Sequence, residues 1–176
     1  MPNRDVHVAL GLGCGLLATT GAVAMRRQRA EPHPADPLHD ILHVLGGALG
    51  GAVGGRLPDL IEPAIHPNHR GPAHSLLAAS GAGGIALLDL VREFEDRCRQ
   101  AAITCRAQRV AAQDAARETH GLRGVVHAVH ASALLVLELW LATLAGVPIG
   151  LAAGYVSHLL ADGLTPKSIP LLGLRI

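Results

Sequence analysis

Long apolar stretches alternate with short polar ones along the chain. Five stretches are apolar enough to form buried or membrane-spanning helices, and they cover residues 6–25, 38–57, 73–90, 122–145 and 147–163. The first carries only His7 and Cys14 as ionisable side chains. As a helix it would be about 30 Å long, the thickness of one hydrocarbon core. The pattern predicts an all-α, multi-helix bundle of about five to six helices, integral to a membrane, with a soluble helical bundle as the alternative.

One strongly polar stretch, residues 92–119, separates the third and fourth apolar segments. Its apolar positions recur at helical spacing, at Val91, Phe94, Cys98, Ala101 and Cys105. This periodicity predicts an amphipathic helix over about 91–119 rather than a linker. We expect a single domain, residues 1–176, in which this charged helix is an insertion that runs alongside the bundle.

Glycine is spaced regularly in the second apolar segment. Gly46, Gly50 and Gly54 repeat every four residues, and the same holds for the residue after each of them. In water this spacing makes a poor helix, because each interior glycine costs about 1 kcal/mol relative to alanine. In lipid it makes a flat face on which another helix backbone packs closely. The segment therefore predicts close packing against another helix, and that helix could belong to a second copy of the chain.

Composition narrows the function classes. An apolar content of 49% with a net charge of +1 excludes a disordered chain. The 15 Lys and Arg balance 14 Asp and Glu, so no nucleic-acid partner is expected. Three cysteines exclude a disulfide framework. The chain nevertheless has 11 histidines, far more than folding requires.

Two short polar stretches between the second and third apolar segments carry candidate chemistry. LPDLIEP, residues 57–63, places Asp59 and Glu62 one helical turn apart. HPNHRGPAHS, residues 66–75, contains His69, Arg70 and His74. Each carboxylate or histidine has an ordinary structural interpretation when it is taken alone. Their concentration in so short a span favours a functional site.

A third stretch, SHLLADGLTP at residues 157–166, ends the last apolar segment. His158 and Asp162 are four residues apart, so their side chains share one helix face. An imidazole and a carboxylate at this spacing form half of a site for a divalent metal. A hydrogen bond between the two inside a core is the structural alternative.

Together with His7 in DVHVALGLG, these stretches resemble the YdjM-type family of predicted membrane-bound metal-dependent hydrolases, whose fold is related to that of zinc-dependent phospholipase C. The resemblance rests on the early His, LPD with a second acid close behind, HRG followed by HS, and GYVSHLLADGLTP. It covers residues 5–24, 54–80 and 147–172. The charged segment is an insertion relative to shorter members of that family.

The resemblance implies a polynuclear metal site with these ligands: His7, Asp59, His69, His74, His158 and Asp162. The chain departs from the family at Ile61, where many members carry the second acid, so Glu62 is the candidate for that role. A ligand set of histidines and carboxylates without cysteine suits zinc, with manganese or iron as alternatives. Two or three ions are expected.

The function predicted from this site is hydrolysis of an ester or a phosphodiester, in a small molecule or a lipid of the bilayer, by metal-activated water. Asp59 or Glu62 would orient the water or bridge two metals. Arg70 would neutralise negative charge that develops on the transition state.

Two other functions stay open at this point. A non-catalytic membrane protein could use the metal to staple a Gly-rich bundle or a partner assembly. A transporter of metal ions or protons would have polar residues spread through the bilayer. Because the acids and paired histidines concentrate near the ends of apolar segments, the pattern favours a hydrolase or a staple.

Alternating helix directions bring the candidate residues to one end of the bundle. They place His39 and His43 at the opposite end, near the cationic cluster of residues 26–29. That cluster favours a cytoplasmic end in a multi-pass protein of a bacterial-type inner membrane, with the metal site at the outer end. The same count of crossings places His127 and His130 near the site, where they would support a ligand or pack rather than bind the metal directly.

Overall fold

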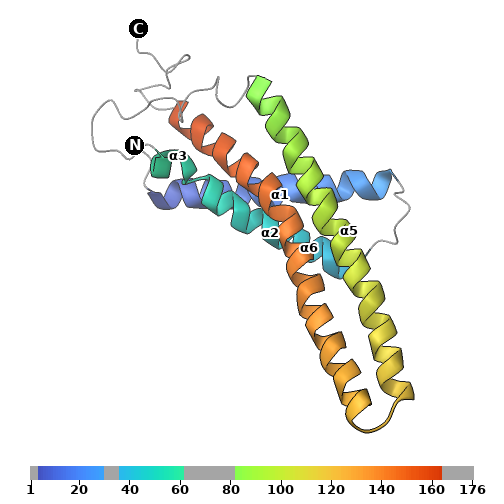
Figure 1. Ribbon diagram of the computed structural model, residues 1–176. Coiled ribbons are helices and arrows are strands. Elements are labelled where there is room, and N and C mark those ends of the chain that lie inside the picture. The colour runs from blue at the N-terminus through green and yellow to red at the C-terminus, as the bar shows by residue number, and fades with distance from the viewer. Residues whose placement is uncertain (1–3, 30–35, 62–81, 164–176) are drawn as a thin grey trace.

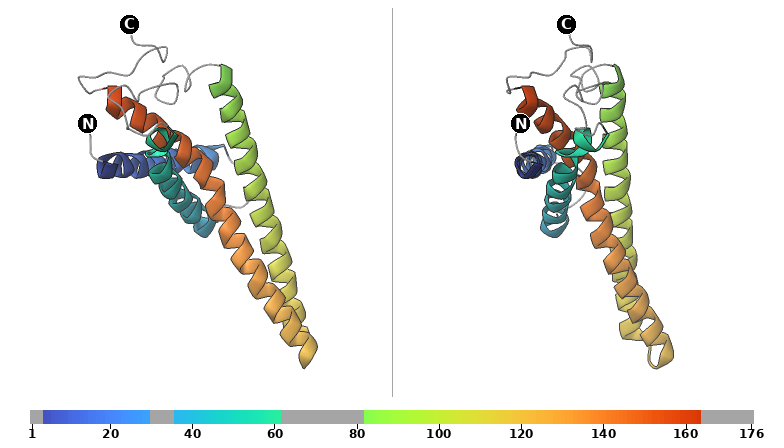
Figure 2. Two further views of the ribbon diagram at one scale, coloured as in Figure 1. Left: turned by 60° about the vertical axis from the view of Figure 1, so that its left-hand side comes forward. Right: turned by 90° about the vertical axis from the view of Figure 1, so that its left-hand side faces the viewer.

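The computed structural model describes residues 4–29, 36–61 and 82–163. These residues form helices without any strand, which confirms the all-α prediction (Figure 1). The helices are α1 (Arg4–Gln28), α2 (Pro37–Gly54), α3 (Leu57–Ile61), α5 (Ala82–Glu118) and α6 (Leu122–Gly163). Helices α1, α2 and α6 pack on one another, and α5 lies antiparallel along α6 (Figures 1 and 2).

The beginning of α2 is encoded locally. Asp36 precedes the helix in an extended conformation, and its carboxylate accepts a hydrogen bond of 3.0 Å from the backbone N–H of Leu38. Pro37 occupies the first turn, where a missing N–H costs nothing. The helix therefore starts one residue before the predicted segment.

Helices α1 and α6 are each long and apolar enough to cross a membrane, over Asp5–Gln28 and Leu122–Gly163. Helix α6 is about twice as long as a membrane-spanning helix needs to be, since its 42 residues extend for about 63 Å. Figure 2 shows its first half projecting with α5 as a long hairpin beyond α1 and α2.

Two expected helix boundaries are absent. The charged stretch does not begin a new helix near residue 91, because α5 runs without a break from Ala82. Likewise, the fourth and fifth apolar segments form one helix, α6, which continues through Pro148. A proline removes one backbone hydrogen bond, but close packing of the flanking turns on α2 holds the helix together there. The charged helix does run alongside the bundle, as expected.

The continuity of α6 corrects the placement of two histidines. His127 and His130 lie near the start of α6, 31 and 28 residues before His158. At about 1.5 Å per residue they are more than about 40 Å from that residue. The prediction that they lie near the site was wrong, because it assumed a chain reversal between the fourth and fifth apolar segments.

Glycines bring the three central helices into backbone contact. A Cβ atom on Gly51 of α2 would overlap the carbonyl group of Gly11 in α1 and lie 2.9 Å from the Cα of Gly15. On the other side of α2, a Cβ on Gly150 of α6 would overlap the carbonyl oxygen of Gly47. Alanine does not fit these contacts without movement of a helix. The predicted close packing of the Gly-rich segment is confirmed, and its partners are helices of the same chain.

These contacts also position the candidate ligands. Each of three ligands lies four residues from a contact glycine: His7 before Gly11, Asp59 after Gly55, and His158 after Gly154. His7 and His158 lie one helical turn from their glycines, and Asp59 follows Gly55 through the short turn between α2 and α3. The glycine contacts therefore bring the three ligands to the same end.

Small side chains line the contact between α5 and α6. Cys105 and Ala112 of α5 pack against Ala131 and Leu134 of α6, and all four are buried. Cys98 continues the same side of α5, and burial raises the pKa of its thiol. These cysteines therefore serve as small apolar residues that allow the two long helices to approach closely.

Candidate metal centre

Four predicted ligands from three helices meet at one end of the bundle. His7 comes from the first turn of α1, Asp59 from α3, and His158 and Asp162 from the last turns of α6. Figure 1 shows these three helix ends together. His7, His158 and Asp162 are buried, with 4%, 0% and 3% of their surface exposed. Such burial of imidazoles and a carboxylate requires compensating interactions.

The spacing of the ligand atoms suits a shared ion. His158 Nε2 lies 3.7 Å from Asp59 Oδ1 and 3.7 Å from Asp162 Oδ2. His7 Nε2 lies 3.7 Å from Asp162 Oδ1. These separations exceed the roughly 3.2 Å limit of a good hydrogen bond. Two ligand atoms on one tetrahedral zinc are about 3.3–3.4 Å apart. These three separations are therefore close to those that a metal ion sets between its ligands, and Asp162 reaches the two histidines through different oxygens.

The orientation of His158 is fixed by the end of α2. Its Nδ1 lies 2.7 Å from the carbonyl oxygen of Gly55, which can only accept a hydrogen bond. Nδ1 therefore carries a proton, and Nε2 is the ring nitrogen that faces Asp59 and Asp162. A backbone carbonyl on the far nitrogen is a common support for a metal-binding histidine. The ring of His7 stacks on that of His158, with centroids 4.0 Å apart.

The donor set is chemically consistent with a divalent cation. Two carboxylates, together with two imidazoles in the neutral form that binds metals, would carry a formal charge of −2, which one divalent ion neutralises. Nitrogen and oxygen donors without thiolate are typical of zinc, manganese and iron sites. His7, Asp59 and His158 offer ligand atoms that all lie within 4.8 Å of one another.

The structure brings together part of the predicted site. His7, Asp59, His158 and Asp162 converge, although they are separated by up to 155 residues in the sequence. The other predicted site residues lie outside the described part of the chain, and they are Glu62, His69, Arg70 and His74.

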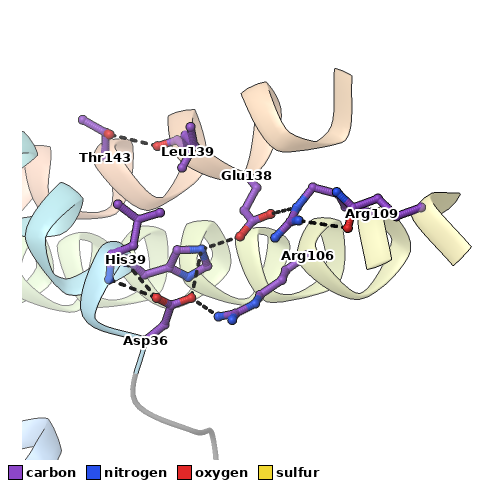
Figure 3. A network of polar contacts seen from close by, with 9 residues as sticks. Asp36, His39, Arg106, Arg109, Glu138, Leu139 and Thr143 are labelled. Carbon is purple, nitrogen blue, oxygen red and sulfur yellow. Dashed lines mark hydrogen bonds and ion pairs between the residues drawn. The ribbon is translucent and has the colours of Figure 1, made fainter. Parts of the chain in front are cut away.

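A second polar cluster joins α2, α5 and α6 (Figure 3). His39 Nε2 lies 2.8 Å from Glu138 Oε1, and Arg109 Nε donates to Glu138 Oε2 at 2.7 Å. Asp36, beside His39, is paired with Arg106. Asp36, His39 and Glu138 are close enough to hold a metal. However, the two guanidinium groups already neutralise both carboxylates, so the geometry is that of an ionic network between helices.

Sequence reasoning did not single out Glu138, although a signal for it exists. It is an acid within a long apolar helix, and its side chain is only 3% exposed. A buried carboxylate in such a helix requires a cation from another element. Arg109, on the charged helix, supplies it.

Further ion pairs extend this second cluster to the end of α1, and together they form a polar layer. Arg26 pairs with Glu95 of α5, and Arg27 pairs with Asp40 of α2 at 2.6 Å. His43 Nε2 lies 3.7 Å from Glu95 Oε1. The prediction that His39 and His43 lie at the end opposite Asp59 is confirmed.

The same number of residues separates the polar layer from the candidate metal centre on two segments of the chain. His39 precedes Asp59 by 20 residues, and Glu138 precedes His158 by 20 residues. The stretch from Glu138 to His158 lies within α6 and therefore extends for about 30 Å. The glycine contacts of α1, α2 and α6 fill the interval between the two polar regions.

Comparisons of the chain with protein-family models, with curated proteins and with solved structures return no match.

Proposed function

We propose that the chain is a membrane-embedded hydrolase whose divalent metal ion is held by His7, Asp59, His158 and Asp162. The observation that carries the proposal is the convergence of two imidazoles and two carboxylates from three helices, at separations longer than hydrogen bonds. The support of His158 by the Gly55 carbonyl adds to it. The resemblance to the YdjM-type family points to the same chemistry.

Zinc is the ion that this donor set favours, with manganese or iron as alternatives. The four described ligands suffice for one ion. A second or third ion would take its ligands from Glu62, His69 and His74. When bound, such ions supply Lewis acidity and make water an effective nucleophile at neutral pH.

The exposed fraction of each side chain suggests its role at the metal centre. Asp162 and His158 are buried and hold their positions by packing at the end of α6. The side chain of Asp59 is 33% exposed, so it stands on the accessible side of the centre. Asp59 is therefore our candidate for orienting water or contacting the substrate. Arg70 is our candidate for neutralising charge on an ester or phosphodiester undergoing hydrolysis.

The proposal that the chain spans a membrane rests on the distance between the metal centre and the polar layer. About 30 Å of apolar, glycine-packed helix separates the metal centre from the layer of Arg26, His39 and Glu138, and this matches one hydrocarbon core. The arginines at the end of α1, Arg26, Arg27 and Arg29, favour a cytoplasmic position for that layer. The metal centre then lies at the outer surface, where a lipid-derived substrate can enter from the bilayer.

A metal-stapled bundle is the second candidate function. The four ligands come from α1, α3 and α6, so a bound ion would cross-link three helices without any reaction. This role requires the same ligands and differs only in the absence of turnover.

Activity of the zinc-loaded protein in detergent micelles separates these two functions. We expect hydrolysis of at least one member of a panel of phosphodiesters, carboxylic esters and phospholipids, with loss of activity on chelation. Asp59→Asn should lower the rate by at least about 100-fold, a typical effect of removing one group that stabilises the transition state. Asp114→Asn, an exposed aspartate on α5, is the matched control and should keep full activity.

The staple predicts a different result. The protein would bind zinc but cleave nothing in the panel, and chelation would lower its melting temperature. That combination would contradict a hydrolytic function while leaving the metal centre intact.

A further inference from the structure

The first half of α6 carries an exposed heptad seam. Its positions follow one another at intervals of 4, 3, 4, 3 and 4 residues: Leu122, Val126, Val129, Ala133, Val136 and Trp140. The five larger side chains are 59–80% exposed, and Ala133 is exposed as well. A repeat of this kind is the pattern by which one helix packs on another through knobs-into-holes contacts.

This exposed seam is distinct from the one that α5 covers. The buried seam contains Ala131, Leu134 and Glu138, again at intervals of 3 and 4 residues. At about 100° per residue, the centres of the two seams lie about 140° apart around α6. A helix with two such seams is built to contact two neighbours, and α5 provides one of them.

The exposed seam continues, toward the start of α6, the interface that the later part of α6 forms with α2. There α2 packs on the same side of the helix, with Gly46 against Thr143 and Gly50 against Val147. Helix α2 begins at Pro37, and the side of α6 that it covers emerges as the exposed seam before Thr143. Among the described residues, none covers the seam from Leu122 to Trp140 to a comparable degree.

Lipid does not fit the surroundings of the seam. The hairpin that carries it also carries the last turns of α5, on which Asp114 and Arg117 have side chains 56% and 79% exposed. Burying such charges in a bilayer is costly. In the membrane position proposed above, the stretch before Glu138 extends for about 24 Å beyond the hydrocarbon core. The seam therefore faces water unless a protein covers it.

We propose that the seam packs against the same seam of a second copy of the chain. No charged residue lies on it, and the ionisable residues next to it in the sequence, Arg123, His127 and His130, include no acid. A surface of this kind offers nothing to an oppositely charged partner, but it is complementary to itself across a two-fold axis. Two α5–α6 hairpins would then form a four-helix bundle.

The direction of packing rests on the membrane part of the proposed function. Copies inserted in one membrane share the same orientation, so their two-fold axis runs along the membrane normal and the α6 helices are parallel. Each seam residue then faces its own equivalent across the axis. Dimerisation itself requires neither metal nor catalysis.

Disulfide cross-linking in native membranes tests this arrangement. In a Cys14→Ser background, Val129→Cys should form a disulfide-linked dimer under mild oxidation. Ala128→Cys, one residue away on an exposed surface outside both seams, is the matched control and should stay monomeric. The native thiols Cys98 and Cys105 are buried and should not contribute. Failure of Val129→Cys to cross-link, or equal cross-linking at position 128, would overturn the proposal.

Mass measurement in detergent gives an independent test. Wild-type protein should have the mass of a dimer by light scattering. Lysines placed together at Val129 and Val136 should weaken the dimer at least about tenfold by like-charge repulsion. Because both side chains are exposed, helical content and zinc binding of this double variant should match the wild type. A monomeric wild type, or a double variant that stays fully dimeric, would contradict the proposed interface. Zinc stoichiometry, measured on the same samples, reports on the proposed function separately.

Discussion

Replacing His158 with alanine is expected to weaken zinc binding by more than about 100-fold. Loss of a group that merely supports a metal ligand costs about 10–100-fold in affinity, and loss of a direct ligand costs more. His158 is fully buried, and its Nε2 stands between Asp59 and Asp162. Its removal leaves these carboxylates without the donor that links them. Competition with a chelator of known affinity measures the change.

His130→Ala is the control for this variant. His130 lies on the same helix, is exposed, and is about 42 Å away along α6. Zinc affinity of this control should equal that of the wild type. If the two variants bind zinc equally well, His158 is not a ligand, and the contact with Gly55 would be purely structural.

Gly51→Ala is expected to lower stability by about 3 kcal/mol, at the upper end of the usual cost of overpacking. The added methyl group would overlap the backbone of Gly11, and backbone atoms cannot rotate away as a side chain does. Helices α1 and α2 would have to separate, which would also move His7 away from Asp59 and His158. We therefore expect a fall of roughly 6–12 °C in the melting temperature, together with weaker zinc binding.

Gly21→Ala provides the matched comparison in the same bundle. A Cβ at Gly21 would meet nothing within 4 Å, so only the helix propensity of the residue changes. Stability should be unchanged or raised by up to about 1 kcal/mol, with zinc affinity unaffected. Equal melting temperatures for the two variants would show that the glycine contacts do not hold the bundle together.

Much of the central bundle could be predicted from the sequence, because its determinants are local. The apolar length of residues 6–25 and the cap formed by Asp36 and Pro37 set α1 and the start of α2 to within a few residues. The four-residue glycine spacing indicated backbone contact, although not which helices would make it.

The candidate ligands were also predictable in part. The four-residue spacing of His158 and Asp162 places both on one face of any helix. Their meeting with His7 and Asp59 was expected from alternating helix directions and from the family resemblance. The support of His158 by the Gly55 carbonyl depends on a contact between residues 103 positions apart, which no local pattern encodes.

The layout of the long hairpin could not be predicted, for physical reasons. Pro148 is a local signal for a helix end, and packing on α2 overrides it. The partners of Glu138 come from α2 and α5, so its ionic network exists only in the folded chain. The exposed seam of α6 is visible in the sequence as a heptad repeat, yet the fold alone distinguishes it from the seam that α5 covers.

Elemental analysis of the purified wild-type protein tests for the proposed metal centre. After removal of loosely bound ions by gel filtration, we expect at least one equivalent of zinc, manganese or iron per chain. The matched Asp162→Asn sample, with its helical content verified, should retain much less than one equivalent. A folded wild-type protein that holds no stoichiometric metal after exposure to these ions would contradict the proposed centre.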